Sequence, residues 1–218
     1  MKVAVLLSGG LDSTTALHWA HRHHEVVCAL SFDYGSNHAK HELACARRQA
    51  EILSVPYHEV DLRSVSAHLQ SALLNGADAI PTGDYAEDNL KQTVVPFRNG
   101  IFLAIAAGIA ESCGAEGIVI AAHNGDHALY PDCREDFMSA MASAISLGTY
   151  ANLQILRPFI ANTKAEITAI GADLGVNFAE TYSCYCGRER HCGQCATCRE
   201  RKESFATTGI PDPTLYEA

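Results

Sequence analysis

The first 21 residues join an apolar segment to a helix through a turn that contains two adjacent glycines. Residues 2–7 are apolar and partly β-branched, which is typical of a buried parallel strand, and residues 15–21 have the character of a helix. Gly9 and Gly10 let the backbone turn tightly and approach a ligand. The first N–H groups of a helix are unpaired and carry partial positive charge, so this junction predicts a site for phosphate or pyrophosphate. Hydroxyl donors are present at Ser8, Ser13, Thr14 and Thr15.

A plainer interpretation of the same junction is a glycine turn followed by a helix that Asp12 or Ser13 caps. The turn has no lysine of the kind that a P-loop needs, and the chain contains no G-x-G-x-x-G, so neither of these nucleotide-binding motifs applies. The residues alone leave both interpretations open.

Strand-like and helix-like segments alternate along the first third of the chain. Residues 25–32 and 57–62 have the pattern of further strands, and residues 38–53 carry an apolar stripe with helical spacing. This order predicts a Rossmann-like, doubly wound parallel α/β sheet with right-handed crossovers. Ligands bind beyond the carboxyl ends of such strands, so we expect the turns at Ser8 and Asp33 to meet in one cleft.

The rest of the chain extends this alternation. Strands are predicted at 117–122 and 153–156, and helices at 64–74, 101–113, 136–146 and 163–174. The helix at 101–113 is apolar nearly all round, so we expect it to be buried, and Thr163 with Glu166 fits a capping box. Residues 75–93 contain glycine, proline and acidic residues without periodicity, and we interpret them as a lid over the cleft.

Composition limits the kinds of partner. The 218 residues are 48% apolar and 19% charged, which is typical of one globular domain with a core. The net charge is −9, with 25 acidic against 16 basic residues, so we expect small-molecule substrates and no nucleic-acid partner. No apolar run is long enough to cross a membrane, and no basic and apolar leader precedes the first strand. We therefore expect no membrane association and a cytoplasmic location.

Five of the nine cysteines lie between Cys184 and Cys198. In a cytoplasmic chain, such a cluster favours a metal site over disulfides. Because the composition changes where this cluster begins, we divide the chain into an α/β domain at 1–180 and a metal-binding segment at 181–218.

The spacing of the clustered cysteines is typical of a closed, tetrahedral zinc site with four thiolates. Three ligands come from the run Cys192, Cys195 and Cys198. The fourth is Cys184, Cys186 or His191. We favour Cys184 because it lies far enough back to close a loop, whereas His191 directly precedes another ligand. An iron–sulfur cluster and metal-free, reduced thiols remain alternatives.

Several other polar side chains could act on a substrate. Arg98 precedes the buried helix, where its guanidinium could hold a carboxylate, cap the helix or face solvent. Asp132 and Arg134 could contact a substrate or simply pair with each other. The further candidates are Lys164 and His38, which are otherwise ordinary helix-start residues, and His123 or His127 as a general base.

The hexapeptide at residues 8–13, Ser-Gly-Gly-Leu-Asp-Ser, resembles the SGGxDS loop of the N-type ATP pyrophosphatases. Those enzymes cleave ATP between its α- and β-phosphates and activate a carboxylate or carbonyl as an adenylate. The resemblance implies that ATP binds here with Mg²⁺, which would neutralise charge as pyrophosphate leaves. The implied ATP-binding residues are Leu7, Ser8, Gly9, Gly10, Leu11, Asp12, Ser13, Thr14, Thr15, Ala16, Leu17 and Asp33.

Further matching segments run through nearly the whole chain and resemble the 7-cyano-7-deazaguanine synthase family. They are Phe32-Asp33-Tyr34-Gly35 with His38 and Glu42, Val95-Pro96 with Arg98-Asn99, Tyr130-Pro131-Asp132-Cys133-Arg134, Lys164-Ala165-Glu166-Ile167, and the cysteines Cys184, Cys192, Cys195 and Cys198. The resemblance implies an ATP-dependent C–N ligase of queuosine biosynthesis. It would join ammonia to 7-carboxy-7-deazaguanine through an adenylate and an amide, and then dehydrate the amide to the nitrile, preQ0. It also implies one structural Zn²⁺ on the four cysteines, and a homodimer.

From these matches we expect a set of site residues. The expected catalytic residues are Asp12, Arg98, Asp132 and Lys164, and the expected substrate-binding residues are Arg98, Asn99, Tyr130, Asp132 and Arg134. Arg98 would orient the carboxylate and Asp132 the guanine-like edge, or the reverse. Phe97, residues 127–129 and Cys186 depart from the family pattern.

Three other functions fit parts of the sequence. They are a deazapurine ligase of another modification pathway, a pyrophosphatase-loop enzyme that modifies tRNA, and a non-catalytic, zinc-stabilised nucleotide-binding module.

Overall fold

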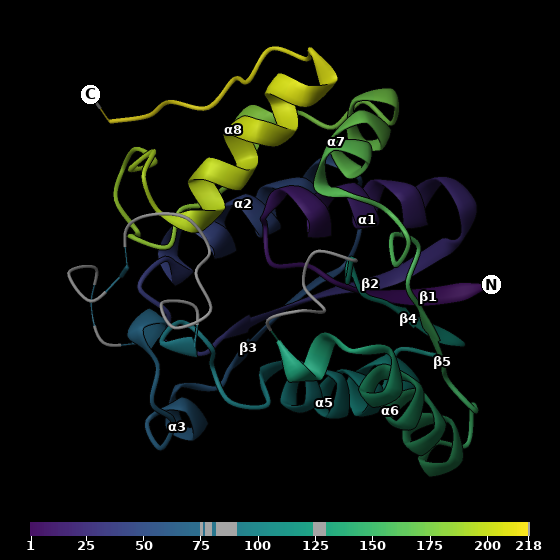
Figure 1. Cartoon of the computed structure of the whole chain (residues 1–218). Helices are drawn as coiled ribbons and strands as arrows, with labels where there is room; N and C mark the ends of the chain where they lie inside the picture. Colours follow the sequence, from purple (N-terminus) through teal and green to yellow (C-terminus); the bar gives the residue numbers. More distant parts are fainter. Residues whose placement is uncertain (75, 77–79, 82–90, 124–129, 218) are drawn as a thin grey trace.

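The computed structural model describes residues 1–74, 76, 80–81, 91–123 and 130–217. Its centre is a five-stranded parallel sheet in the order β3-β2-β1-β4-β5 (Figure 1). The strands are β1 (Lys2–Leu6), β2 (Glu25–Asp33), β3 (Tyr57–Asp61), β4 (Gly117–Val119) and β5 (Gln154–Leu156). The predicted doubly wound parallel sheet is confirmed. The strand order reverses between β1 and β4, which is where such sheets open a crevice for ligands.

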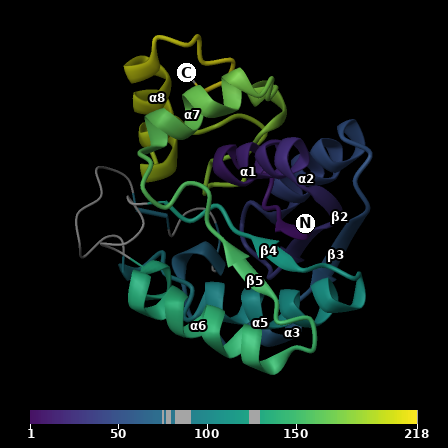
Figure 2. The same ribbon diagram turned by 90° about the vertical axis from the view of Figure 1, so that its right-hand side faces the viewer.

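Helices cover both faces of the sheet (Figures 1 and 2). One face carries α1 (Leu11–His23), α2 (Ala39–Ile52), α7 (Lys164–Asp173) and α8 (Ala196–Thr208). The other face carries α3 (Arg63–Ser66), α5 (Arg98–Ser112) and α6 (Glu135–Gly148). Short 3₁₀ turns lie at η1 (Ala72–Leu74), η4 (Pro131–Cys133) and η5 (Phe178–Glu180).

The two hydrophobic cores follow from the alternation of side chains along β1. Val3 and Val5 pack on the side of α1 and α7, whereas Ala4 and Leu6 pack on the side of α5 and α6. All four are buried, because a central parallel strand is covered on both faces. The sheet is therefore a rigid platform for the loops at its carboxyl edge.

Several predicted elements differ from the structure. The segment predicted as one helix at 64–74 contains only α3 and η1, and the strand predicted at 117–122 ends at Val119. The predicted burial of α5 is only partly right, because Ala104 and Gly108 are exposed on its outer face. Sequence reasoning missed α8 altogether.

The starts of α7 and α1 are capped in different ways. The capping box is confirmed: Thr163 accepts a hydrogen bond from the Glu166 N–H, and Glu166 accepts one from the Thr163 N–H. Capping of α1 by Asp12 or Ser13 is wrong, since Gly10 is the N-cap and no side chain caps this helix.

Most of the lid predicted at 75–93 lies outside the described residues, and so does His127. Within the described ranges, no helix combines the length and the apolar character needed to cross a membrane.

Candidate active site and metal centre

A cavity of about 260 Å³ opens at the carboxyl edge of the sheet, where the strand order reverses. Seven parts of the chain line it: the loop after β1, the end of β2 with the start of α2, the start of α5, the residues after β4, Tyr130 and Cys133 at η4, Lys164 at the start of α7, and the Cys-rich segment at 182–198 together with α8. The prediction that the turns after β1 and β2 meet at one site is therefore confirmed. The cavity is the natural place for a ligand in this fold.

The loop at residues 8–13, which we call the phosphate loop, forms one end of the cavity. The hydroxyl oxygens of Ser8 and Ser13 lie 2.9 Å apart, and the Ser8 N–H donates to the Ser13 hydroxyl at 3.1 Å. The first helical hydrogen bond of α1 runs from the Thr14 N–H to the Gly10 carbonyl, at 3.1 Å. The N–H groups at the start of α1 thus have no acceptor within the helix, which suits an anion.

Gly9 cannot be replaced without moving the backbone. Its φ is +87°, and a Cβ at this position would lie 2.1 Å from the carbonyl oxygen of Glu42 in α2. On its other side, the Gly9 carbonyl accepts a hydrogen bond of 3.0 Å from the Tyr182 N–H of the Cys-rich segment. The phosphate loop is therefore held between α2 and the Cys-rich segment.

The predicted ATP-binding residues divide into two groups. Leu7, Ser8, Gly10, Leu11, Asp12 and Ser13 line the cavity. Thr14, Thr15, Ala16 and Leu17 are fully buried and belong to the packing of α1, and Asp33 and Gly9 also lie outside the lining. Asp33 instead accepts a hydrogen bond from the Gly35 N–H at 3.0 Å and faces Arg63 at 3.6 Å.

Charged groups from three elements meet beside the phosphate loop. The Nζ of Lys164, the first residue of α7, donates to Oδ2 of Asp12 at 2.5 Å and lies 3.5 Å from a carboxylate oxygen of Glu200 in α8. The Nε2 of His123, which follows β4, lies 3.9 Å from the same Asp12 oxygen. Oδ1 of Asp12 is buried and has no hydrogen-bond partner within the described part of the chain. That oxygen is the one available for a cation.

Arg98 enters the cavity at the start of α5. It is half-buried, and the phenols of Tyr34, Tyr185 and Tyr130 surround it. Burial alone would lower the pKa of the guanidinium, but these phenols outweigh burial and raise that pKa above its ordinary value. No carboxylate of the described residues lies within 4.0 Å of Arg98, so the guanidinium can receive an acid from outside.

Asp132 does not line the cavity. Its Oδ2 accepts a hydrogen bond of 2.7 Å from the Asn99 N–H, and the Asn99 amide donates to the Cys133 sulfur at 3.1 Å. Asp132 therefore fixes the start of α5, next to Arg98. Arg134 is exposed and outside the lining, and it forms no ion pair with Asp132, whereas Asn99 and Tyr130 do line the cavity.

A second carboxyl, on α2, lies in the same cavity. Oε2 of Glu42 is 3.4 Å from Nε2 of His38, and only 18% and 3% of the two side chains are exposed. Burial raises the pKa of Glu42 to about 8, although the charge of Arg98 opposes this shift. Burial, reinforced by Arg98, lowers the pKa of His38 to about 4. Sequence reasoning named His38 as a candidate but noted Glu42 only as part of a motif.

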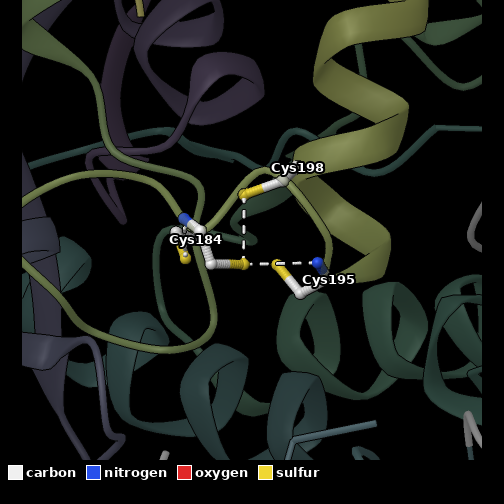
Figure 3. A group of neighbouring side chains, drawn as sticks. Cys184, Cys195 and Cys198 are labelled. Atoms are coloured by element: carbon white, nitrogen blue, oxygen red, sulfur yellow. Dashed lines mark hydrogen bonds between the residues drawn. The ribbon is translucent and has the colours of Figure 1, made fainter. Parts of the chain in front are cut away.

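The four predicted metal ligands lie together beside the cavity. The sulfur atoms of Cys184, Cys192, Cys195 and Cys198 are all within 4.8 Å of one another. Figure 3 shows Cys184 from the Cys-rich segment and Cys195 and Cys198 from the start of α8 pointing toward a common centre. The Cys192 and Cys198 sulfurs are 3.9 Å apart. Zn–S bonds of about 2.3 Å arranged as a tetrahedron place sulfurs about 3.8 Å apart, so these residues fit a four-thiolate metal ion.

Backbone donors complete this metal centre. The N–H groups of Cys192 and Cys195 donate to the sulfurs of Cys184 and Cys192, each at 3.3 Å. Such N–H···S bonds favour the thiolate form. His191 and Cys186 lie outside the group, and Nε2 of His191 accepts a hydrogen bond of 3.0 Å from the Ser183 N–H.

The metal centre and the cavity share one piece of chain. Side chains of the Cys-rich segment and of α8 form a wall of the cavity, namely Tyr182, Ser183, Tyr185, Thr197 and Glu200. Sequence reasoning missed all five. The only sequence signal for them is their place beside the cysteines, because the segment's packing on the phosphate loop is a tertiary contact.

Comparison with known proteins gives one family. The model for queuosine biosynthesis protein QueC matches residues 2–209. A Porphyromonas gingivalis protein named 7-cyano-7-deazaguanine synthase is 50% identical over 213 residues, covering 98% of this chain and 96% of that protein. A Rhizobium johnstonii protein of the same name is 45% identical, covering 100% of this chain and 92% of its own.

Solved structures with a similar fold are more distant. The U34-tRNA thiolase NcsA from Methanococcus maripaludis, with its [4Fe-4S] cluster, is 16% identical at a TM-score of 0.52, covering 96% of this chain and 66% of that chain. An NMN synthetase from Francisella tularensis is 11% identical at a TM-score of 0.53, covering 96% and 77%. At these identities the likeness concerns the fold. The match over residues 2–209 and the near-full-length relatives establish that this chain belongs to the QueC family of queuosine biosynthesis proteins.

Proposed function

We propose that this chain is an ATP-dependent C–N ligase that converts 7-carboxy-7-deazaguanine and ammonia to 7-cyano-7-deazaguanine through an adenylate and an amide. The observation that carries the proposal is the cavity at the strand-order reversal, which has the phosphate loop at one end and Arg98 among tyrosines at the other. The names of the near-full-length relatives support the same reaction.

On the ATP side, the phosphate loop would bind the phosphates through Ser8, Gly10, Ser13 and the first N–H groups of α1. The Lys164 ammonium, which contacts Asp12 in the structure, would bind the same phosphates when ATP displaces that contact. Asp12 is the residue that would hold Mg²⁺, because its buried Oδ1 has no partner among the described residues. When bound, Mg²⁺ would neutralise charge as pyrophosphate leaves.

On the substrate side, Arg98 would hold the carboxylate close to the α-phosphate, and Asn99 and Tyr130 would line the place of the deazaguanine. Positioning of this kind supplies much of the rate in a two-substrate ligation. Asp132 would act through its contact with the Asn99 N–H, which fixes the start of α5. For Asp132 or Arg134 to contact the guanine-like edge, the side chain concerned would have to turn into the cavity.

We also propose that the metal of residues 181–218 is Zn²⁺ with a structural role. A closed set of four thiolates leaves no position for a substrate, and it would cross-link a segment that forms a wall of the cavity. Elemental analysis of the purified protein tests this, with one zinc per chain expected. A brown protein that contains iron would overturn the zinc assignment.

The proposed partners are small molecules and a second copy of the chain. Light scattering on purified protein is expected to give the mass of a homodimer. A gel shift with tRNA is expected to show no binding at any salt concentration, and salt-dependent binding would instead favour a tRNA-modifying enzyme.

The direct test of the proposed function is incubation with 7-carboxy-7-deazaguanine, ammonium, ATP and Mg²⁺. We expect the nitrile, AMP and pyrophosphate to form, and none of them when the deazapurine is left out. Omission of ammonium should leave pyrophosphate release but no amide. Absence of both nitrile and AMP from the complete mixture would refute the proposal.

A further inference from the structure

Glu42 lies directly beneath the phosphate loop. Its backbone carbonyl is the atom that a Cβ at Gly9 would approach to 2.1 Å, so this turn of α2 touches the loop. Its side chain lines the same cavity as Ser8 and Arg98. A substrate whose carboxylate lies between Arg98 and a phosphate bound at this loop therefore has its carboxyl carbon close to Glu42.

The surroundings of Glu42 leave its carboxyl group open to the cavity. Within the described part of the chain, this carboxyl makes its polar contact with Nε2 of His38, at 3.4 Å. The other titratable or charged groups that face it are Arg98 from α5, Tyr34 after β2 and Cys45 on α2. The Tyr185 ring packs on the His38 imidazole at 5.4 Å and closes this side.

Near neutral pH, Glu42 and His38 together hold one titrating proton, and this proton lies on the Glu42 carboxyl. Because burial brings the pKa of His38 to about 4, its imidazole is neutral near neutral pH. Because burial raises the pKa of Glu42 to about 8, its carboxyl group gains and loses a proton near the pH at which an enzyme works. A carboxyl that served only to bind Arg98 would instead lie within ion-pair distance of that guanidinium.

The proposed reaction releases a proton from nitrogen three times. In amide formation, ammonia forms a C–N bond, the C–O bond to AMP breaks, and one N–H proton leaves. In nitrile formation, the amide oxygen forms a bond to the α-phosphate of ATP as pyrophosphate leaves, and the amide NH2 group loses one proton to give the adenylated imidate. The imidate then loses AMP by cleavage of its C–O bond, and the C=N–H group loses its proton as the C≡N bond forms. Each of these proton losses needs an acceptor within reach of the same nitrogen.

We infer that Glu42, with the neutral imidazole of His38 beside it, is the acceptor of the N–H proton in the amide-forming and nitrile-forming steps. The inference rests on the proposed function, since it concerns the same cavity and the same substrate. Glu42 has no role in the first activation of the carboxylate, which releases no N–H proton. A loss in the amide-forming and nitrile-forming steps without a loss in carboxylate activation therefore separates proton acceptance by Glu42 from simple substrate binding.

The test compares wild-type protein with Glu42→Gln, Glu42→Asp and the control Glu51→Gln, which changes an exposed residue of the same helix. Nitrile formation is followed from 7-amido-7-deazaguanine and ATP, so that ammonia does not enter the kinetics. Glu42→Gln is expected to lose about 100-fold or more in this step. ATP–pyrophosphate exchange driven by the carboxylate is expected to stay close to wild type. Glu42→Asp, with a shortened carboxyl, should be intermediate, and Glu51→Gln should match wild type.

The pH profile gives a second readout. In the wild type, the rate from the amide should rise with pH and level off near the pKa of Glu42, because the acceptor must be deprotonated. Glu42→Gln should lose this rise. Thermal melting and zinc content of each variant report on folding, and nitrile formation by Glu42→Asp at the wild-type rate would overturn the inference even if the Gln variant did not fold.

Three results separate the possible failures. Nitrile formation by Glu42→Gln at the wild-type rate would refute the inference. A raised KM for the deazapurine with unchanged kcat would also refute it, since the carboxyl would then bind substrate. If wild-type protein itself forms neither amide nor nitrile, the proposed function fails, whatever Glu42 does.

Discussion

Replacement of Gly9 by alanine is expected to disconnect the phosphate loop from α2. The left-handed backbone at φ +87° costs an alanine about 1–2 kcal/mol. The Cβ would lie 2.1 Å from a backbone oxygen of Glu42 and 2.8 Å from the Ala46 nitrogen, so neither neighbour can yield by a side-chain rotation. Overpacking of this kind costs about 1–3 kcal/mol more. Together these terms predict a loss of about 2–5 kcal/mol in the free energy of unfolding.

That loss leaves a folded protein but displaces the loop. For a chain of this size, about 1 kcal/mol corresponds to about 2–4 °C in Tm, so calorimetry should show a drop of roughly 4–20 °C. A displacement of about 1 Å at the phosphates is expected to lower kcat/KM for ATP about 100-fold. Pyrophosphate release with 7-carboxy-7-deazaguanine measures that loss.

Two glycines serve as controls. A Cβ at Gly10 would have its nearest neighbour, the Ser8 hydroxyl, at 3.4 Å, and a Cβ at Gly108 would meet nothing within 4 Å. Gly10→Ala should keep the wild-type Tm, and Gly108→Ala, in the middle of α5, should raise Tm by about 1–4 °C and keep activity. A Gly9→Ala protein with wild-type Tm and wild-type KM for ATP would refute the argument that close packing against α2 shapes the loop.

Three further predictions concern the other parts of the site. Arg98→Lys should lower kcat/KM for the deazapurine about 10- to 100-fold, because an ammonium lacks the planar fork that binds a carboxylate. Steady-state kinetics should give an unchanged KM for ATP, and an equal loss for both substrates would contradict this prediction. Asp132→Ala should lower the free energy of unfolding, measured by chemical denaturation, by about 0.5–2 kcal/mol. Asp132→Asn, which keeps an acceptor for the Asn99 N–H, should lower it less. Equal effects of both variants on deazapurine affinity would instead favour direct contact of Asp132 with substrate. Removal of the metal with a chelator should lower Tm and abolish ATP-dependent pyrophosphate release, and addition of Zn²⁺ but not Mg²⁺ should restore both. Activity that persists after complete removal of the metal would contradict a structural role.

Local patterns in the sequence predicted the parts of the fold that depend on local rules. The apolar strands, the glycine turn before α1 and the Thr163 capping box each depend on neighbouring residues, and the structure confirms them. The cysteine spacing predicted the four side chains that lie together, because a metal imposes its own geometry on the chain.

The rest of the site depends on tertiary packing that no local pattern records. Asp132 looked like a substrate ligand because it is a carboxylate in a polar stretch, but its position turns it toward the Asn99 N–H. Tyr182 and Glu200 reach the cavity only because the Cys-rich segment packs on the phosphate loop and α8 packs on α7. Glu42 shares the helical stripe of α2 with ordinary polar residues, and only its burial beside His38 sets it apart.

The hydrogen bond between the Tyr182 N–H and the Gly9 carbonyl joins two segments that lie far apart in the sequence. A ribosome makes the phosphate loop well before the Cys-rich segment, so the loop lacks one of its two supports until that segment has been made. The nascent chain should therefore be unable to hold ATP until the Cys-rich segment has emerged and taken up its metal. Metal supply then limits how quickly newly made chains become active, even when ATP and substrate are abundant.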